Sequence, residues 1–137
     1  MNIRKLKLSK YDISGKRVKE LCGFCEQYPD WKKELSSHAY ISAVQYGDEP
    51  KSSNHENSDT TARHALRMLK YKRNVELIEK VAKEVDSEYW EHLIKAICYE
   101  VPLNYLINID GMHMSPSTFY EKRKFFFYLL DEEKQKE

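Results

Sequence analysis

The polar segment SPSTFYEKRK, residues 115–124, has side chains of the types that contact double-stranded DNA. Lysine and arginine can pair with phosphate or guanine, hydroxyl groups can meet phosphate or base edges, and a glutamate can accept from the amino group of cytosine. The segment therefore predicts base and phosphate contacts. The residues expected to make them are Ser115, Ser117, Thr118, Tyr120, Glu121, Arg123 and Lys124.

A second group of cations lies upstream, between Thr60 and Val75, where the sequence holds no acidic residue. Such a local positive patch is what phosphate contact requires, even though the net charge of the chain is only +1. The alternative is a solvated helix face that acids elsewhere balance. The cations expected to contact phosphate are Arg63, Arg67, Lys70, Lys72 and Arg73.

A helix beginning at Pro116 is expected to carry the polar segment. The oxygen of Ser115 can accept from exposed N–H groups at a helix start, and proline lacks an N–H that would be unsatisfied there. The first half of this helix has one clear apolar anchor, Phe119, whereas FFFYLL at 125–130 is apolar all round. The second half must therefore be wrapped by other helices or by a second subunit, while the first half projects outward.

This arrangement is typical of the recognition helix of a helix-turn-helix protein. Helical spacing places the stem of Arg123 near the core side and Tyr120 at the margin. The side chains expected on the side away from Phe119 and Phe126 are Ser117, Thr118, Glu121 and Lys124.

Two breaks upstream complete the pattern. Asp110-Gly111 is a turn dipeptide, because glycine enters positive φ without a steric penalty. Val101-Pro102 ends one helix and starts another, since the residue before proline disfavours helical geometry. The short helix between these breaks places Leu103, Leu106 and Ile107 on one face.

The helix expected before Pro102 runs from Ser87 to Glu100, with Asp86 or Ser87 as its cap. It would serve as the scaffold helix of a three-helix unit. The side chains that it is expected to bury are Trp90, Leu93, Ile94 and Ile97.

The layout resembles the RinA/ArpU-like group of phage and prophage transcriptional regulators, whose C-terminal half is similar to the helix-turn-helix of sigma factors. The resemblance is carried by residues 115–130, by Tyr105, Leu106 and Gly111, and by segments 58–85 and 27–35. It implies sequence-specific DNA binding and control of phage transcription. By position it assigns DNA contact to Ser117, Thr118, Tyr120, Glu121, Arg123 and Lys124. The turn departs from the usual pattern, because Met112, His113 and Met114 are bulky.

Composition predicts an all-α chain. With 137 residues, four glycines, four prolines and no sustained strand alternation, it is expected to be one domain or one domain with an appendage. The start of the sequence lacks the continuous apolar core of a secretory signal, and no apolar run approaches the length of a membrane span. A cytoplasmic protein without membrane contact is therefore expected.

Three segments are predicted. Residues 1–44 form a helical hairpin with a basic lead, which would pack on the rest, pair with a second copy as a homodimer, or hold a partner such as RNA polymerase. Residues 45–58 form a linker or mobile loop. Residues 59–137 form the helical DNA-binding domain, with the helix-turn-helix at about 87–133.

A long helix capped by Ser58 or Asp59 is expected at the start of this domain. The side chains expected on its inward face are Ala62, Ala65, Leu66, Leu69, Leu77, Ile78, Val81 and Val85.

Cys22 and Cys25 form a C-x-x-C pair, which is half of a zinc site if His38 and His55 supply the remaining ligands. The simpler interpretation is that both thiols are small core residues. It is favoured because a second pair at ligand spacing is missing and the two thiols lie on an apolar stripe with Val18 and Leu21. No metal or cofactor is expected.

Enzymatic function is not expected, because the sequence has no glycine-rich phosphate loop, no H-E-x-x-H and no catalytic histidine cluster. The function predicted is sequence-specific DNA binding with base readout by the last helix and phosphate contacts from the basic half of the long helix. The alternatives are a helical scaffold or assembly protein and a small terminase-like DNA-packaging protein.

Overall fold

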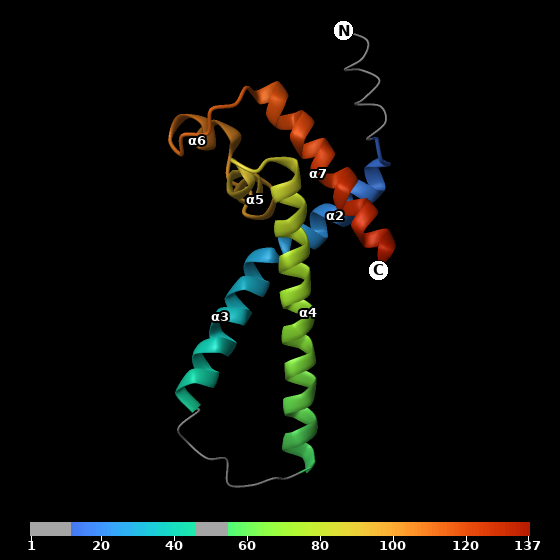
Figure 1. The fold of residues 1–137 in the computed structure, drawn as a ribbon, viewed down its shortest axis with the longest axis vertical. Coiled ribbons are helices and arrows are strands. Elements are labelled where there is room, and N and C mark those ends of the chain that lie inside the picture. The colour runs from blue at the N-terminus through green and yellow to red at the C-terminus, as the bar shows by residue number, and fades with distance from the viewer. Residues whose placement is uncertain (1–11, 46–54) are drawn as a thin grey trace. The chain divides into compact units, whose positions relative to one another are not determined.

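The chain is all-helical throughout the part that its computed structural model describes, residues 12–45 and 55–137 (Figure 1). The prediction of an all-α protein is therefore confirmed. None of the helices in these ranges is both long enough and apolar enough to span a bilayer. In chain order the helices are α2 (Gly15–Glu26), α3 (Tyr28–Gln45), α4 (His55–Val85), α5 (Trp90–Cys98), α6 (Leu103–Asn108) and α7 (Pro116–Lys136).

The chain divides into two compact units, and the boundary between them falls within α4. The helix-turn-helix unit contains α2 and Leu77–Glu137, and the α3–α4 unit contains Tyr28–Glu76. These boundaries differ from those of the three segments expected from the sequence. In particular, the start of α4 at His55 makes residues 55–58 helical, although they were expected to belong to a linker.

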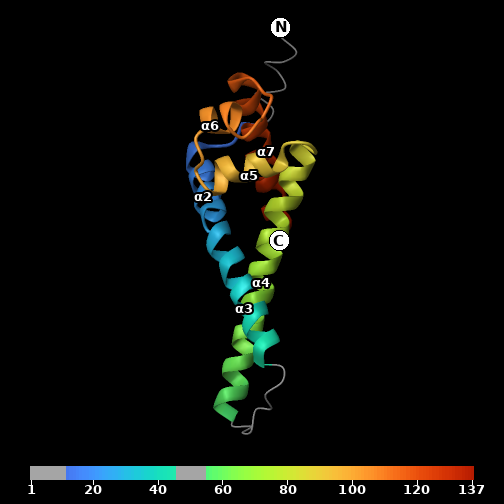
Figure 2. The same ribbon diagram turned by 90° about the vertical axis from the view of Figure 1, so that its left-hand side faces the viewer.

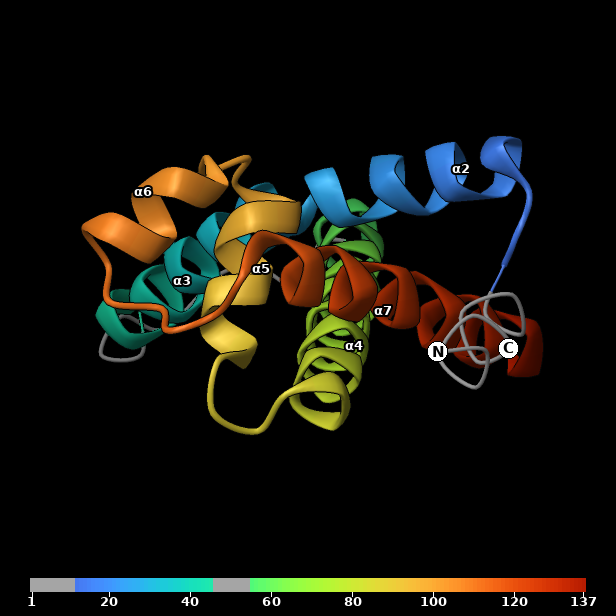
Figure 3. The ribbon, with the colours of Figure 1, turned by 90° about the horizontal axis from the view of Figure 1, so that it is seen from above.

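The core of the helix-turn-helix unit is built by all five of its helical parts. α2 packs against α5 and α7, as Figure 3 shows, and Arg17 Nε of α2 donates to Asp131 Oδ1 of α7 at 2.6 Å. Burying a large apolar side chain contributes about 1.5–3 kcal/mol, so this cluster is the main source of stability in the unit. Its buried side chains are Leu21, Cys25, Ile78, Val81, Ala82, Leu93, Ile94, Ile97, Cys98, Leu106, Met112, Phe119, Phe126, Phe127 and Leu130.

The α3–α4 unit, whose two helices are drawn in Figure 2, is held by aromatic and imidazole contacts. The rings of Trp31 on α3 and Tyr71 on α4 stack with centroids 6.2 Å apart. Farther along the same helices, His38 Nδ1 lies 2.9 Å from His64 Nε2, which is a hydrogen-bond distance. Met68 and Val75 of α4 are buried as well. The side of α4 that carries Met68, Tyr71 and Val75 is therefore the inner side.

The inward face expected for the first half of α4 was wrong. Ala62, Ala65, Leu66 and Leu69 are all exposed, with 66% of Leu66 and 58% of Leu69 accessible. The expectation is confirmed farther along, where Ile78 and Val81 are fully buried and Leu77 and Val85 are half-buried. The first half of α4 has apolar residues on two opposite sides, and spacing alone does not decide which side α3 covers.

The start predicted for α5 was also wrong. Asp86 Oδ1 accepts from the N–H groups of Glu88 and Tyr89, at 2.9 and 2.8 Å, and this turn delays the helix until Trp90. Trp90 is half-buried rather than buried, and Lys83 Nζ lies 4.6 Å from the centroid of its ring.

Of the cysteine pair, Cys25 belongs to the core, whereas Cys22 is half-buried. A hydrogen bond with Cys98, together with burial, raises the pKa of the Cys25 thiol, so this thiol stays protonated and unreactive. Among the side chains that the structure describes, no three metal-binding groups gather. His38 pairs with His64 instead, and the side chain of His55 lies outside the described residues.

Replacing Phe126 with alanine is expected to lower the free energy of unfolding by about 3–5 kcal/mol, because the fully buried ring would leave a cavity. Tyr120→Ala, on the same helix but 58% exposed, should change it by no more than about 0.5 kcal/mol. Urea denaturation followed by circular dichroism measures both. If the two substitutions lowered the free energy of unfolding equally, the rear half of α7 would not be what fixes this helix in the core.

Candidate nucleic-acid interface

The turn between α6 and α7 is fixed from both sides. Gly111 adopts a φ of 74°, the left-handed conformation that the Asp110-Gly111 dipeptide predicts. The N–H of Met112 donates to the carbonyl of Leu106 at 2.9 Å, and the Met112 side chain is fully buried beneath the turn. The bulky residue in the turn is therefore part of the core, and it holds the start of α7 at a defined place.

α5 anchors the same turn through charge. Lys95 Nζ donates to Asp110 Oδ2 at 2.6 Å, and His92 Nε2 lies 3.2 Å from the Asp110 carbonyl oxygen. The hydrogen bond from Lys95 lowers the pKa of Asp110, so the carboxylate stays charged at neutral pH.

α7 begins as its sequence predicts. The N–H of Thr118 donates to Ser115 Oγ at 3.2 Å, which caps the helix. The Ser115 hydroxyl also donates to Thr118 Oγ1 at 2.9 Å. Ser115, Ser117 and Tyr120 are exposed, whereas Thr118 and Glu121 are half-buried. The outward surface of the first two turns therefore presents hydroxyl groups and one aromatic ring.

Lys122 is tied to its own unit at the front of α7. Its Nζ donates to Asp86 Oδ2 at 2.7 Å, and only 9% of the Asp86 side chain is accessible. Burial alone would raise the pKa of Asp86, but the hydrogen bonds from Lys122, Tyr89 N–H and Glu88 N–H outweigh it and lower the pKa below its ordinary value of 3.8. This ion pair is a structural link between α7 and the turn before α5.

Arg123 is held differently. Its guanidinium lies 4.8 Å from the centroid of the Phe127 ring, and Nη2 lies 3.8 Å from Cys22 Sγ. Its stem runs toward the core side, as helical spacing predicts. Arg123 therefore covers the apolar rear of α7 and is not placed on its outward face.

Lys124 pairs with Asp12, but this ion pair is open to solvent. The Lys124 side chain is 37% accessible and that of Asp12 is 60% accessible. Exposed pairs of this kind contribute at most about 1 kcal/mol, so a phosphate can replace Asp12 at little cost. Lys124 is thus the most available of the three cations at the front.

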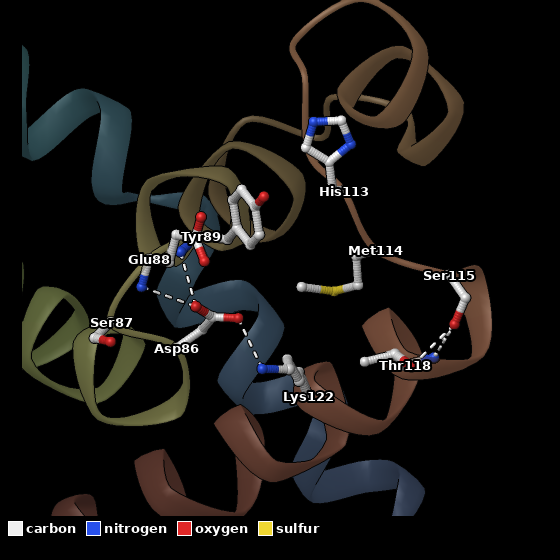
Figure 4. A pocket seen from close by; sticks show the side chains of 9 residues that line it. All are labelled: Asp86, Ser87, Glu88, Tyr89, His113, Met114, Ser115, Thr118 and Lys122. Atoms are coloured by element: carbon white, nitrogen blue, oxygen red, sulfur yellow. Dashed lines mark hydrogen bonds and ion pairs between the residues drawn. The ribbon is translucent and has the colours of Figure 1, made fainter.

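A cleft of about 440 Å³ opens beside the start of α7 (Figure 4). Ser115 and Thr118 form one wall, His113 and Met114 of the turn form another, and the Lys122–Asp86 pair crosses its floor. Asp86 and Glu88 add negative charge to the Lys122 side, so the cleft is not an anion pocket. Its nine lining residues are Asp86, Ser87, Glu88, Tyr89, His113, Met114, Ser115, Thr118 and Lys122.

The surface around the turn carries little positive charge. Between Tyr99 and Glu121 the sequence contains no lysine or arginine, and Tyr105 and Ile109 of the α6 region are 49% and 69% exposed. The five cations of the upstream group all have exposed side chains, and they belong to the α3–α4 unit. Any electrostatic attraction to DNA must therefore come mainly from residues outside the turn.

Several contributors to this surface were not expected. The partners Asp12 and Asp86 were missed because ion pairs between distant segments leave no local pattern. Exposed Tyr105 and Ile109 were missed because α6 was considered only for its packing face. Tyr105 precedes Leu106 by one residue, which is about 100° around a helix, so spacing would have placed it outside that face. Ile109 follows Leu106 by three residues, so spacing alone would not have marked it as exposed.

Comparison with known protein families, with curated proteins and with solved structures found no match for this chain.

Replacing Asp86 with asparagine should flatten the dependence of stability on pH in acid. Because the pKa of Asp86 is lower in the folded than in the unfolded chain, its stabilisation is present above the ordinary value of 3.8 and is lost as pH falls through the folded pKa. Thermal unfolding between about pH 6 and pH 2 measures this loss. The wild type should lose more stability across that window than the Asp86→Asn variant. Parallel curves would contradict a stabilising Asp86–Lys122 pair.

Proposed function

We propose that this protein is a sequence-specific DNA-binding transcriptional regulator whose α7 inserts its first two turns into the major groove. The observation that carries the proposal is the single face formed by Ser117, Tyr120 and Lys124. These residues are three and four positions apart, so they share one side of α7, and that side lies opposite buried Phe119 and Phe126.

The chemistry of this face matches groove contact. The Ser117 hydroxyl can donate or accept at a base edge or phosphate, and the ring of Tyr120 offers apolar contact such as a thymine methyl group requires. Lys124 can exchange its exposed partner Asp12 for a phosphate oxygen. Thr118 and Glu121 are half-buried at the edge of this face. They would therefore help to orient α7 on the duplex, whereas the three exposed residues would make the main contacts.

The basic group of α4 is proposed to contribute phosphate contacts. Phosphate recognition needs exposed cations without nearby acids, and the segment from Thr60 to Val75 provides them. A role in phage or prophage transcription, with RNA polymerase as a partner and a homodimer as the binding form, rests on the resemblance of the sequence to RinA/ArpU-like regulators.

Selection from a random duplex library tests the proposal directly. The full chain should enrich a defined motif, and its affinity for the selected duplex should exceed that for a shuffled duplex and fall steeply as salt rises. Enrichment of no motif, with equal affinity for both duplexes, would overturn a regulatory function and favour an assembly or packaging role.

Tyr120→Ala is expected to weaken binding to the selected duplex by about 5- to 150-fold, equivalent to roughly 1–3 kcal/mol for the loss of a base contact. Binding to the shuffled duplex should change little, because phosphate contacts remain. Fluorescence anisotropy measures both affinities. Gln135→Ala serves as the control, because this exposed residue lies at the far end of the same helix. A Tyr120 variant that retains full discrimination would exclude Tyr120 from base readout.

Lys124→Ala should weaken binding to selected and shuffled duplexes alike and reduce the salt dependence by about one phosphate contact. The matched control is Lys136→Ala, which removes an exposed lysine from the last turn of α7. The affinity measured as a function of salt concentration separates the two variants. If both variants behave as the wild type does, Lys124 does not contact DNA.

A further inference from the structure

An exposed apolar stripe runs along the first half of α4. We call it the α4 stripe, and it consists of Ala62, Ala65, Leu66 and Leu69. Their spacing of three and four residues places them along one side of the helix. Leu66 and Leu69 are 66% and 58% accessible, so two large apolar side chains next to one another face solvent.

The α4 stripe points away from α3. The inner side of this part of α4 carries buried Met68 and Val75, and Tyr71 stacks on Trp31 of α3. Leu66 precedes Met68 by two residues, which is about 200° around a helix. The stripe is therefore a second apolar side, which none of the described side chains of the α3–α4 unit covers.

Phosphate contact does not account for these leucines. A leucine side chain offers phosphate neither positive charge nor a hydrogen-bond donor, and it stabilises a contact only when an apolar surface buries it. Arg63 and Lys70 flank the stripe on one side, and Arg73 continues its line one turn beyond Leu69. The α4 stripe thus combines an apolar centre with a cationic border.

A second copy of this chain fits the stripe poorly. An antiparallel pair that packs Leu66 of one copy on Leu69 of the other brings Arg63 of one near Lys70 of the other. A parallel pair sets Arg73, which lies on the line of the stripe, beside its own equivalent. Between Thr60 and Val75 no acidic residue is present to relieve this repulsion. The border instead complements a partner with negative charge.

We propose that the α4 stripe is a docking surface for an acidic amphipathic helix of another protein. Such a helix would place leucine-like side chains against Leu66 and Leu69 at its own three- and four-residue spacing. Its flanking carboxylates would pair with Arg63, Lys70 and Arg73. This contact goes beyond DNA binding by α7, and it would compete with phosphate for the same cations.

A synthetic peptide probes this surface. It has about 18 residues, roughly 27 Å as a helix, with leucines on one face and glutamates beside them. One control peptide has the same composition in scrambled order, and another has lysine in place of glutamate. Fluorescence anisotropy with the full chain should show saturable binding of the amphipathic acidic peptide, and much weaker binding of both controls.

The variants assign the contact. Leu66→Ser combined with Leu69→Ser should weaken peptide binding at least tenfold while leaving the melting temperature unchanged, because both side chains are exposed. Ile109→Ser is the matched control, since it removes an equally exposed apolar side chain from the helix-turn-helix unit and should not affect the peptide. Arg63→Ala with Lys70→Ala should weaken binding and reduce its dependence on salt.

Three results would overturn the docking surface. The acidic peptide could bind no better than the scrambled peptide, or the double leucine variant could bind it unchanged. Alternatively, sedimentation could show a wild-type dimer that the double leucine variant abolishes, which would make a second copy the occupant. DNA affinity measured on the double leucine variant keeps this outcome separate from that of the proposed function, because this variant leaves both α7 and the cations of α4 intact.

Discussion

The burial of the rear half of α7 is the constraint on which the candidate interface depends. Phe126, Phe127 and Leu130 are almost fully buried, and Phe119 joins them seven residues before Phe126 on the same side of the helix. Fixing these four side chains fixes the rotation of α7 about its axis. The side that carries Ser117 must then face outward, and its orientation follows from apolar packing rather than from any polar contact.

Contacts near the start of α7 add to the constraint that the buried rear half places on the orientation of the helix. The side chain of Met112 is fully buried beneath the turn before α7, and the Lys122–Asp86 ion pair connects the second turn of α7 to the turn before α5. Arg123 lies over Phe127 and shields the core from solvent. As a result, two of the three neighbouring cations are part of the scaffold. The outward face is left with hydroxyl groups, a tyrosine ring and Lys124, a composition suited to reading groove shape and methyl groups more than to attracting the duplex.

Local signals in the sequence predicted the parts of the fold that local chemistry determines. Ser115-Pro116, Asp110-Gly111 and Pro102 each restrict the backbone by themselves, and the helix start, the left-handed turn and the helix break all occur where expected. The inward side of the first half of α4 was predicted wrongly because that choice is made by α3, a separate helix, whereas the prediction was confirmed at Ile78 and Val81. The partners of Lys122 and Lys124 were not predictable, since the ion pairs join segments that are distant in sequence. DNA binding itself remains a prediction.

Backbone amide shifts of an isotope-labelled full-length chain, followed by nuclear magnetic resonance as the selected duplex is added, test the role of α7 most directly. The account predicts that the largest changes occur at the amides of Ser115 to Lys124 and saturate together with the binding measured in solution. Unchanged amides across this stretch, with shifts confined to other helices, would contradict the claim that the outward face of α7 enters the groove.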